Sequence, residues 1–308
     1  MSLRHYPSPD KDFLVRTTLP TSELSVRAVA AAVAIARAHG VRCTTPAVLT
    51  DRSNVLVHLR PAPVVARVAT TTALVRPNAR VWLAREIAVA QFLVARGAGV
   101  VPPSSEVPPG PHEADGFAVS FWRFVVHHPD HLPAAVEVGR SLAALHRVLR
   151  DFPDALPYLA SPLDEVPRWL DALERAGALA TSDLTLLRQV YERVAAVLRT
   201  PVGPVQALHG DAHTHNVLVT AEGLLWTDFE DTCCGPLAWD LACFARTAPW
   251  GAEAALASYG DAPSQEALQP YVEARFLQGT VWYAVLALRF PECQAQAKAA
   301  LRRWHEHA

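Results

Sequence analysis

Three histidines and an aspartate alternate within the segment ALHGDAHTHNVLV, at residues 207–219. They are His209, Asp211, His213 and His215. In an extended strand these four side chains would share one face, because successive side chains point to opposite sides. Imidazole and carboxylate groups in such an arrangement are typical ligands of zinc or iron, and Asp228 or Glu230 could add a further ligand. One hypothesis is therefore a metal-dependent hydrolase.

The residues that follow favour a different chemistry. Asn216 lies five positions after Asp211, and Asp228 ends a strand-like run about a dozen residues later. Asparagine is a poor zinc ligand but a good oxygen donor to magnesium. In phosphoryl transfer, one carboxylate orients the attacking hydroxyl while other oxygen ligands hold the metal that bridges the phosphates. We favour a phosphoryl-transfer loop over the hydrolase.

Three motifs follow one another between residues 208 and 242: HGDAHTHN, TDFED and GPLAWDLA. Their pattern of H-x-D-x4-N, D-F-E and D-L-A resembles the aminoglycoside phosphotransferase and choline kinase family, distant relatives of the protein kinases. The resemblance implies an α+β, two-lobed protein-kinase-like fold, with a small β-rich N-lobe and a larger helical C-lobe. It also implies magnesium-dependent transfer of a phosphoryl group from ATP to a hydroxyl of an aminoglycoside-, choline- or sugar-like molecule. The sequence does not distinguish ATP from GTP as the donor.

The resemblance assigns a role to each matching residue. Asp211 would be the catalytic base that orients the substrate hydroxyl. Asn216 and Asp228 would bind magnesium. Glu230 would either assist at a second metal or pair with another group within its own loop.

The same resemblance separates supporting residues from reacting ones. His209 would hold the loop through hydrogen bonds, and Asp240 would accept bonds from the loop backbone. His213 and His215 would be scaffold or exposed residues rather than metal ligands.

A kinase-like site also needs a cation on the phosphates and an acid that holds this cation. Arg67, in the strand-like run VVARVA, occupies the position where such folds place lysine, and Glu86 on the next helix is its expected partner. Arginine can hold a phosphate and a carboxylate together, so the replacement is workable. It also leaves open a nucleotide-binding pseudokinase that binds ATP without turnover.

The remaining nucleotide contacts are expected on two segments. The phosphate turn LTDRSNVLVHL contains no glycine, and Ser53 and Asn54 are its candidate donors. The strand FAVSFWRFV occupies the position of a kinase hinge, which would place Ser120, Phe121 and Trp122 near adenine.

Hydrophobic periodicity and turn residues divide the chain into an N-lobe at 1–122 and a helical C-lobe at 123–308. In the N-lobe we predict a helix at 21–39 capped by Thr or Ser, strands at 46–50, 54–60, 64–69 and 116–125, and a helix at 78–97 capped by Asn78. In the C-lobe we predict helices at 132–150, 164–176 and 182–199, with Pro133 in the first turn of the first. A hairpin follows the histidine segment, and from residue 237 onward the pattern is helical, interrupted by Pro249, Pro263 and Pro291.

The composition is that of a folded protein: 308 residues, of which 51% are hydrophobic, with a formal net charge of −2. This charge gives no reason to expect nucleic acid or an anionic membrane as a partner. No apolar run approaches the ~20 residues that cross a bilayer, and the N-terminus lacks a signal-peptide core, so we expect a cytosolic protein. The expected partners are a nucleotide and a small hydroxylated acceptor.

The C-terminal 59 residues carry six acids and five lysines or arginines, so they show no strongly acidic trough for a polycationic antibiotic. Tyr271, Trp282 and Tyr283 could stack on a sugar or enclose a quaternary amine, or could be core residues. A small metabolite is as good a candidate as an antibiotic.

Overall fold

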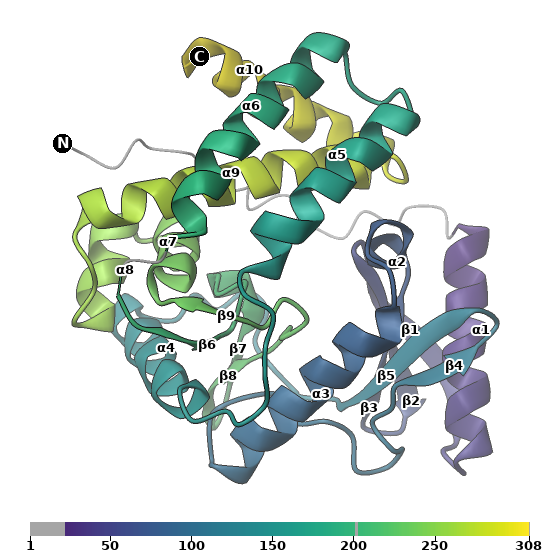
Figure 1. Ribbon diagram of the computed structural model, residues 1–308. Coiled ribbons are helices and arrows are strands. Elements are labelled where there is room, and N and C mark those ends of the chain that lie inside the picture. The colour runs from purple at the N-terminus through teal and green to yellow at the C-terminus, as the bar shows by residue number, and fades with distance from the viewer. Residues whose placement is uncertain (1–21, 201–202, 308) are drawn as a thin grey trace.

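The computed structural model describes residues 22–200 and 203–307, which form a sheet lobe and a helical lobe (Figure 1). The sheet lobe contains α1 (Glu23–Ala38), β1 (Cys43–Asp51), β2 (Asn54–Pro61), β3 (Val64–Ala69), α2 (Thr71–Val75), α3 (Ala79–Ala95), β4 (His112–Ala114) and β5 (Phe117–Arg123). Its five strands form one antiparallel sheet in the order β1-β2-β3-β5-β4. The α+β architecture predicted from the sequence is the one observed.

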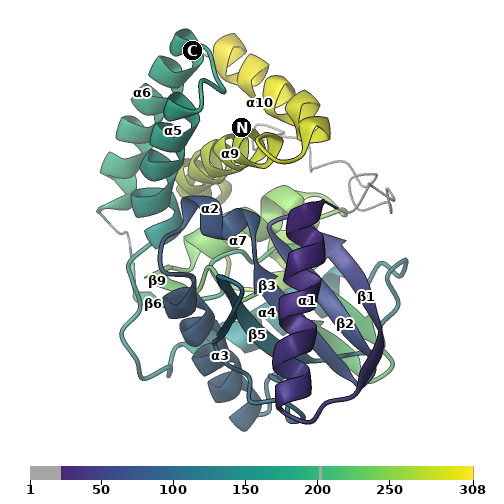
Figure 2. The ribbon, with the colours of Figure 1, turned by 90° about the vertical axis from the view of Figure 1, so that its right-hand side faces the viewer.

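The alternation of side chains along β3 decides which of its residues face α3. Ala66 and Val68 pack with α1 in one core, whereas Val65 and Ala69 contact the apolar side chains of α3. Figure 2 shows α1 lying across the sheet. Because side chains alternate between the two faces of a strand, Arg67 falls on the α3 side.

The helical lobe is built around one long helix. It contains α4 (Ala135–Leu149), a π-helical turn (Ser161–Glu165), α5 (Val166–Arg175), α6 (Thr181–Leu198), β6 (Val205–Leu208), a 3-10 turn (Thr214–Asn216), β7 (Val217–Thr220), β8 (Gly223–Trp226), β9 (Cys233–Pro236), α7 (Ala238–Thr247), α8 (Ala252–Tyr259), α9 (Gln265–Ala287), a second 3-10 turn (Pro291–Cys293) and α10 (Gln294–His307). Helix α9 packs against α5, α6, α7 and α10 (Figure 1). β7 and β8 form the predicted hairpin, and β6 pairs with β9.

Of three local details, the first confirms a sequence prediction and the other two correct one. Ser22 caps α1 by accepting a hydrogen bond from the Ser25 N–H at 3.3 Å, while Thr21 lies outside the described residues. Asn78 precedes α3, but its left-handed backbone (φ 57°) leaves its side chain without a capping bond. Helix α4 begins at Ala135, so Pro133 lies before its first turn.

The turn between β1 and β2 is fastened to the helical lobe. Arg289, just after α9, donates to Asp51 at 2.7 Å and to the Thr71 hydroxyl at 2.8 Å. Arg52 forms an ion pair with Glu292 at 2.8 Å. These bonds join the tip of the sheet lobe directly to the C-terminal helices.

Within residues 22–200 and 203–307, no helix is long and apolar enough to span a lipid bilayer.

Candidate active site

Asp240 on α7 holds the loop that follows β6. Its Oδ2 accepts the His209 backbone N–H at 2.8 Å, and its Oδ1 accepts that of Gly210 at 3.0 Å. His146 of α4 lies 3.0 Å from Oδ2, and the aspartate is completely buried. Burial alone would raise the pKa of Asp240, but the hydrogen bond and charge of His146 lower it below its ordinary value. The carboxylate is thus an ionised clamp on the loop.

Asp211 directly follows the two residues that Asp240 holds, and its side chain is about one third exposed. Its Oδ1 accepts from Arg275 at 3.2 Å and lies 3.5 Å from the Cys243 sulfur, and its Oδ2 lies 3.2 Å from His213 Nε2. Burial acts to raise the pKa of Asp211, but His213 and Arg275 outweigh it and lower the pKa well below its usual range. This side chain can therefore accept a hydrogen bond while staying ionised.

Arg275, on α9, was not predicted as a site residue. Its side chain is buried, donates to the carbonyl of Gly210 and to Gln278 at 3.0 Å, and lies 3.8 Å from the Trp239 ring centroid. It ties the loop of Asp211 to the central helix. The only signal of this role in the sequence is a basic residue within a largely apolar helix.

Asn216 and Asp228 lie at the same end of the β7–β8 hairpin. The Thr227 N–H donates to the carbonyl of Asn216 at 2.9 Å, and the Asn216 side-chain NH2 donates to the Asp211 carbonyl at 3.0 Å. Because the NH2 group of this amide donates to Asp211, its oxygen is directed away from the Asp211 carbonyl. Asp228 has a left-handed backbone (φ 68°) and a side chain more than one third exposed. The structure thus brings together three residues that the sequence assigned to one site.

Arg67, on β3, lies at the centre of a cluster of charged side chains, which we call the Arg67 wall. Its guanidinium contacts Glu86 at 2.8 Å, Asp228 at 2.6 Å and Glu230 at 2.7 Å. Burial raises the pKa of Glu86 to about 8 and that of Glu230 to about 7, although Arg67 opposes both shifts. Glu86 is thus a partner of Arg67, as expected, and three carboxyl groups surround this single guanidinium.

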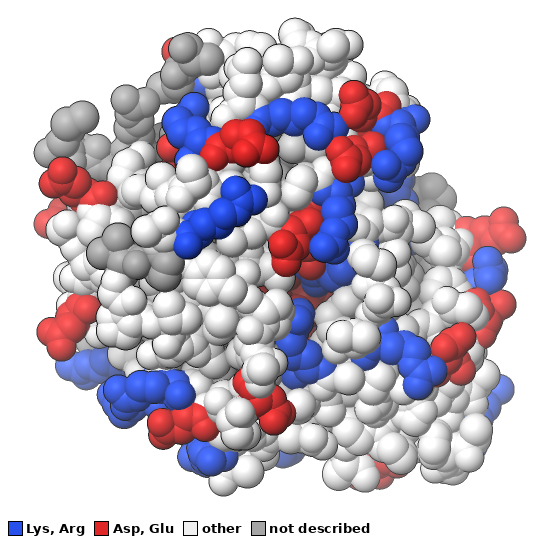
Figure 3. Space-filling model, viewed as in Figure 1, with Lys and Arg blue, Asp and Glu red and all other residues white. Residues whose placement is uncertain are grey.

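Further acids and cations surround this cluster where the two lobes meet (Figure 3). Arg76 contacts Glu165 at 2.7 Å, pairs with Asp231, and approaches Glu230 at 3.8 Å. Arg76, Glu165 and Asp231 were not predicted, because their contacts span 89 and 155 residues of sequence. Together with the Arg67 cluster they give this wall more carboxyl groups than guanidinium groups.

The two predicted nucleotide segments lie on either side of Arg67. The Asn54 side chain donates to Glu230 at 2.9 Å, and the carbonyl of Ser53 accepts from the Thr72 N–H at 2.9 Å. In β5, Ser120 is fully buried and its hydroxyl accepts from Trp122 Nε1 at 2.9 Å.

Phe121 presents no vacant backbone group on that strand. Its N–H donates to the Pro109 carbonyl, and its own carbonyl accepts from the Ser104 N–H, each at 2.9 Å. A bond from the Phe121 N–H to adenine would require its bond to Pro109 to be displaced, whereas the carbonyl oxygen keeps a second lone pair.

The four alternating residues do not lie on a strand, because β6 ends at Leu208 and a 3-10 turn begins at Thr214. His209 is buried, with its Nε2 3.1 Å from the Thr227 carbonyl, whereas His215 is exposed. In the described part of the chain, no three His, Cys, Asp or Glu side chains are grouped to hold a metal ion. The expectation of a shared strand face was wrong, because the chain turns between these residues.

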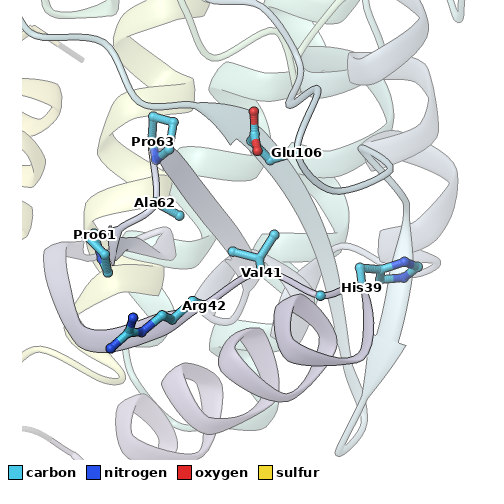
Figure 4. Close-up of a pocket in the computed structure, with 8 residues that line it drawn as sticks. His39, Val41, Arg42, Pro61, Ala62, Pro63 and Glu106 are labelled. Carbon is cyan, nitrogen blue, oxygen red and sulfur yellow. The ribbon is translucent and has the colours of Figure 1, made fainter.

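A separate cavity lies away from these residues, at the end of α1 and beside the β2–β3 turn (Figure 4). It has a volume of about 460 Å³, and none of the candidate site residues lines it.

Replacement of Gly210 by alanine is expected to disrupt the site. The Gly210 backbone has φ +90°, and an added β-carbon would lie 1.9 Å from the carbonyl oxygen of Asp231. Gly251 has nearly the same φ (+92°) but open space around it, so Gly251→Ala isolates the backbone strain alone. We expect Gly210→Ala to lower the free energy of unfolding by at least ~2 kcal/mol more than Gly251→Ala, measured by urea denaturation. Equal losses in the two variants would contradict the observed packing.

A family model described as "Phosphotransferase enzyme family" matches residues 74–277. A comparison with curated proteins found no match.

Solved structures with the same fold include several small-molecule kinases. A choline/ethanolamine kinase family protein from Mesorhizobium loti is 16% identical, with a TM-score of 0.57 over 85% of this chain and 87% of that chain. An amicoumacin kinase in complex with AMP-PNP, Ca2+ and Ami is 12% identical, with a TM-score of 0.62 over 90% and 93%. The GDP and kanamycin complex of APH(2")-IIia is 16% identical, with a TM-score of 0.60 over 89% and 97%. At these identities the likeness establishes the two-lobed kinase-like fold.

Proposed function

Because the chain belongs to the phosphotransferase enzyme family, we propose that it transfers the γ-phosphoryl group of ATP to a hydroxyl of a small molecule. The observation that carries this proposal is the meeting of Asp211, Asn216 and Asp228 at one end of the β7–β8 hairpin. The Asp228 carboxylate faces the Arg67 cluster of the other lobe, since Arg67 bonds directly to it. A hydroxyl-orienting acid, oxygen ligands and a phosphate-binding cation are the parts that phosphoryl transfer requires.

Asp211 would act on the acceptor. The acceptor hydroxyl donates a hydrogen bond to the Asp211 carboxylate while its oxygen forms a bond to the γ-phosphorus. The bond from this phosphorus to the bridging oxygen breaks, and ADP leaves with the electron pair. Because the pKa of Asp211 is held low, the carboxylate is a weak base, so it orients the hydroxyl and takes the proton late in the transfer.

The oxygen ligands suit a divalent cation. Asp228 has an accessible carboxylate and Asn216 an amide oxygen turned from its only side-chain bond, and magnesium prefers such ligands. The surplus of carboxyls near Arg67 also fits an added positive charge, as do the buried, unpartnered Glu86 Oε2 and Asn54 Oδ1. When bound, Mg2+ would neutralise charge on the phosphates. The complex of the amicoumacin kinase with AMP-PNP and Ca2+ supports the use of a nucleotide with a divalent cation.

Magnesium-dependent nucleotide binding is the expected result of a first test. Thermal-shift titrations compare ATP and GTP, each with and without Mg2+, on wild type, Asp228→Ala and Asp261→Ala. At a hundredfold excess over its Kd, a ligand of the native state adds ~2.7 kcal/mol to stability. We expect a Mg2+-dependent shift in wild type that Asp228→Ala loses. Asp261→Ala, which removes an exposed acid between α8 and α9, should retain it.

Two results would overturn the proposal. No shift with either nucleotide would exclude the proposed nucleotide site. A shift without ADP formation across a panel of hydroxylated acceptors would favour the pseudokinase.

A further inference from the structure

Arg246, on α7, is a half-buried cation without a partner. Across residues 22–200 and 203–307 its guanidinium makes no hydrogen bond or ion pair, and its Nε is buried without an acceptor. Of the other arginines nearby, Arg67, Arg76 and Arg275 each contact at least one carboxylate, and Arg85 donates to the Glu230 carbonyl at 3.1 Å. Partial burial of a charged group costs free energy unless an ion pair or hydrogen bond compensates for the lost hydration. The unpaired Arg246 therefore implies a binding partner that is absent here.

The position of Arg246 shows where this partner would lie. Cys243, one turn earlier on α7, meets Asp211 at 3.5 Å, so this face of the helix is directed at the reacting side of the loop. A terminal guanidinium nitrogen of Arg246 lies 3.8 Å from the point where a β-carbon on Gly279 would stand. Gly279 is one turn after Arg275, which itself reaches Asp211.

The absence of a side chain at Gly279 leaves room beside this guanidinium. Gly279 is only partly covered, although its neighbours Gln278 and Thr280 on α9 are buried. A ligand group at this point would touch the free nitrogens of Arg246 and lie on the Asp211 side of α9. The strongest electrostatic neighbours of Arg246 are Cys243 and Arg275, and desolvation with the repulsion of Arg275 lowers its pKa.

This face differs in charge from the Arg67 wall. The Arg67 wall has a surplus of carboxyls, whereas beside Asp211 the carboxylates of Asp211 and Asp240 lie 3.2 and 3.9 Å from Arg275 and leave Arg246 unpaired. A polycationic acceptor would meet like charges here. An acceptor with an oxyanion would instead supply the missing partner of Arg246.

On the basis of the proposed function, we infer that the acceptor is a hydroxylated acid whose oxyanion, a carboxylate or a phosphate, binds Arg246 while its hydroxyl meets Asp211. Arginine presents a planar fork of donors that matches either oxyanion, and it would fix the acceptor by a charge-assisted pair. Gly279 gives the oxyanion space, and Arg275 keeps Asp211 ionised.

The inference is tested with acceptors that differ only in the anion. Wild-type protein with Mg-ATP is given glycerate, glycerol 3-phosphate and glycerol, then gluconate, glucose 6-phosphate and glucose, with kanamycin as the cationic probe. Thermal shifts measure binding and ADP formation measures turnover. We expect at least one acid to stabilise the protein and to exceed its neutral partner about tenfold in kcat/KM. The carboxylates and the phosphate esters distinguish the two sources of the oxyanion.

The Arg246→Gln variant is expected to raise KM for the preferred acid about 10- to 100-fold, the effect of losing a hydrogen bond to a charged group, with kcat changing less. Arg246→Lys should recover part of this loss. Arg302→Gln, which changes an exposed residue of α10, should leave KM unchanged. The unliganded Arg246→Gln protein should melt no lower than wild type, because no bond is removed. A merely structural arginine would instead lower the melting temperature.

The outcomes separate this inference from the proposed function. Equal or stronger binding of the neutral compounds or of kanamycin, unchanged in Arg246→Gln, would overturn the inference and leave phosphoryl transfer intact. If no acid stabilises the protein more than its neutral partner, the inference also fails. If Mg-ATP produces no thermal shift in the wild-type protein, the proposed function itself is overturned.

Discussion

The Asp211→Asn variant is expected to lose phosphoryl transfer by about 10³-fold or more in kcat, while it stays folded and binds Mg-ATP. Asparagine preserves the shape of the side chain but lacks the negative charge that we propose orients the acceptor hydroxyl. Proton transfer by a positioned group typically contributes 10²- to 10⁴-fold to a rate. The measurement is ADP formation at saturating nucleotide, with a thermal-shift titration of the same protein.

The loop itself should survive the Asp211→Asn change. Arg275 keeps its bonds to the Gly210 carbonyl and Gln278, and Asp240 still holds the backbone N–H groups. Retention of more than a tenth of the wild-type kcat, with normal folding, would remove Asp211 from the catalytic role.

The Asp240→Asn variant is expected to lose about 3 kcal/mol of unfolding free energy and most of its activity. Both carboxylate oxygens of Asp240 accept backbone N–H groups, from His209 and Gly210. In either orientation, an asparagine would direct its NH2 group at one of these donors. Breaking a buried charged interaction by removing one partner costs roughly 3–5 kcal/mol. Urea denaturation at pH 7 measures the loss.

The pH dependence supplies a second readout of Asp240. The pKa of Asp240 is lower in the folded protein than in the unfolded chain. Its contribution to stability is therefore complete above about pH 4 and disappears as the pH falls through the folded-state value. The stability difference between wild type and Asp240→Asn should narrow in that acidic range.

A surface carboxylate serves as the control for this variant. Asp171 pairs with Arg188 at 2.8 Å, but its side chain is about half exposed. Asp171→Asn should therefore change stability by less than ~0.5 kcal/mol. Equal effects of Asp171→Asn and Asp240→Asn would show that Asp240 does not act as a buried clamp.

Local pattern predicted the elements well where a single segment carries the information. The short valine-rich run VVARVA, bounded by a turn, predicts a strand, and β3 places Arg67 on the face of α3, where it meets Glu86. The spacing from Asp211 to Asn216 and Asp228 lies within one loop and one hairpin, so the sequence could group these residues. Family membership agrees with the motifs that suggested it.

Other features depend on packing that no local pattern encodes. Helix α2 begins almost directly after β3, so no turn sequence marks its start. Its residues Thr71 and Thr72 donate hydrogen bonds to carbonyls in the β1–β2 turn. Arg275 reaches Asp211 across 64 positions, and Arg76 reaches Glu165 across 89. Such contacts require the relative placement of helices, which composition and periodicity do not specify.

The fastening of the β1–β2 turn has a consequence for the entropy of ligand binding. A glycine-rich turn is mobile when empty, and a nucleotide must then immobilise it, at a cost of roughly 1–2 kcal/mol for each residue fixed. Here Arg289 and Glu292 hold Asp51 and Arg52, and the hydroxyls of Thr71 and Thr72 donate to the carbonyls of Arg52 and Ser53. A ligand that binds beneath this turn meets a preorganised surface, so less of its interaction energy is lost to ordering the chain. The lack of glycine is thus compatible with nucleotide binding, because rigidity supplied by the other lobe replaces flexibility within the turn.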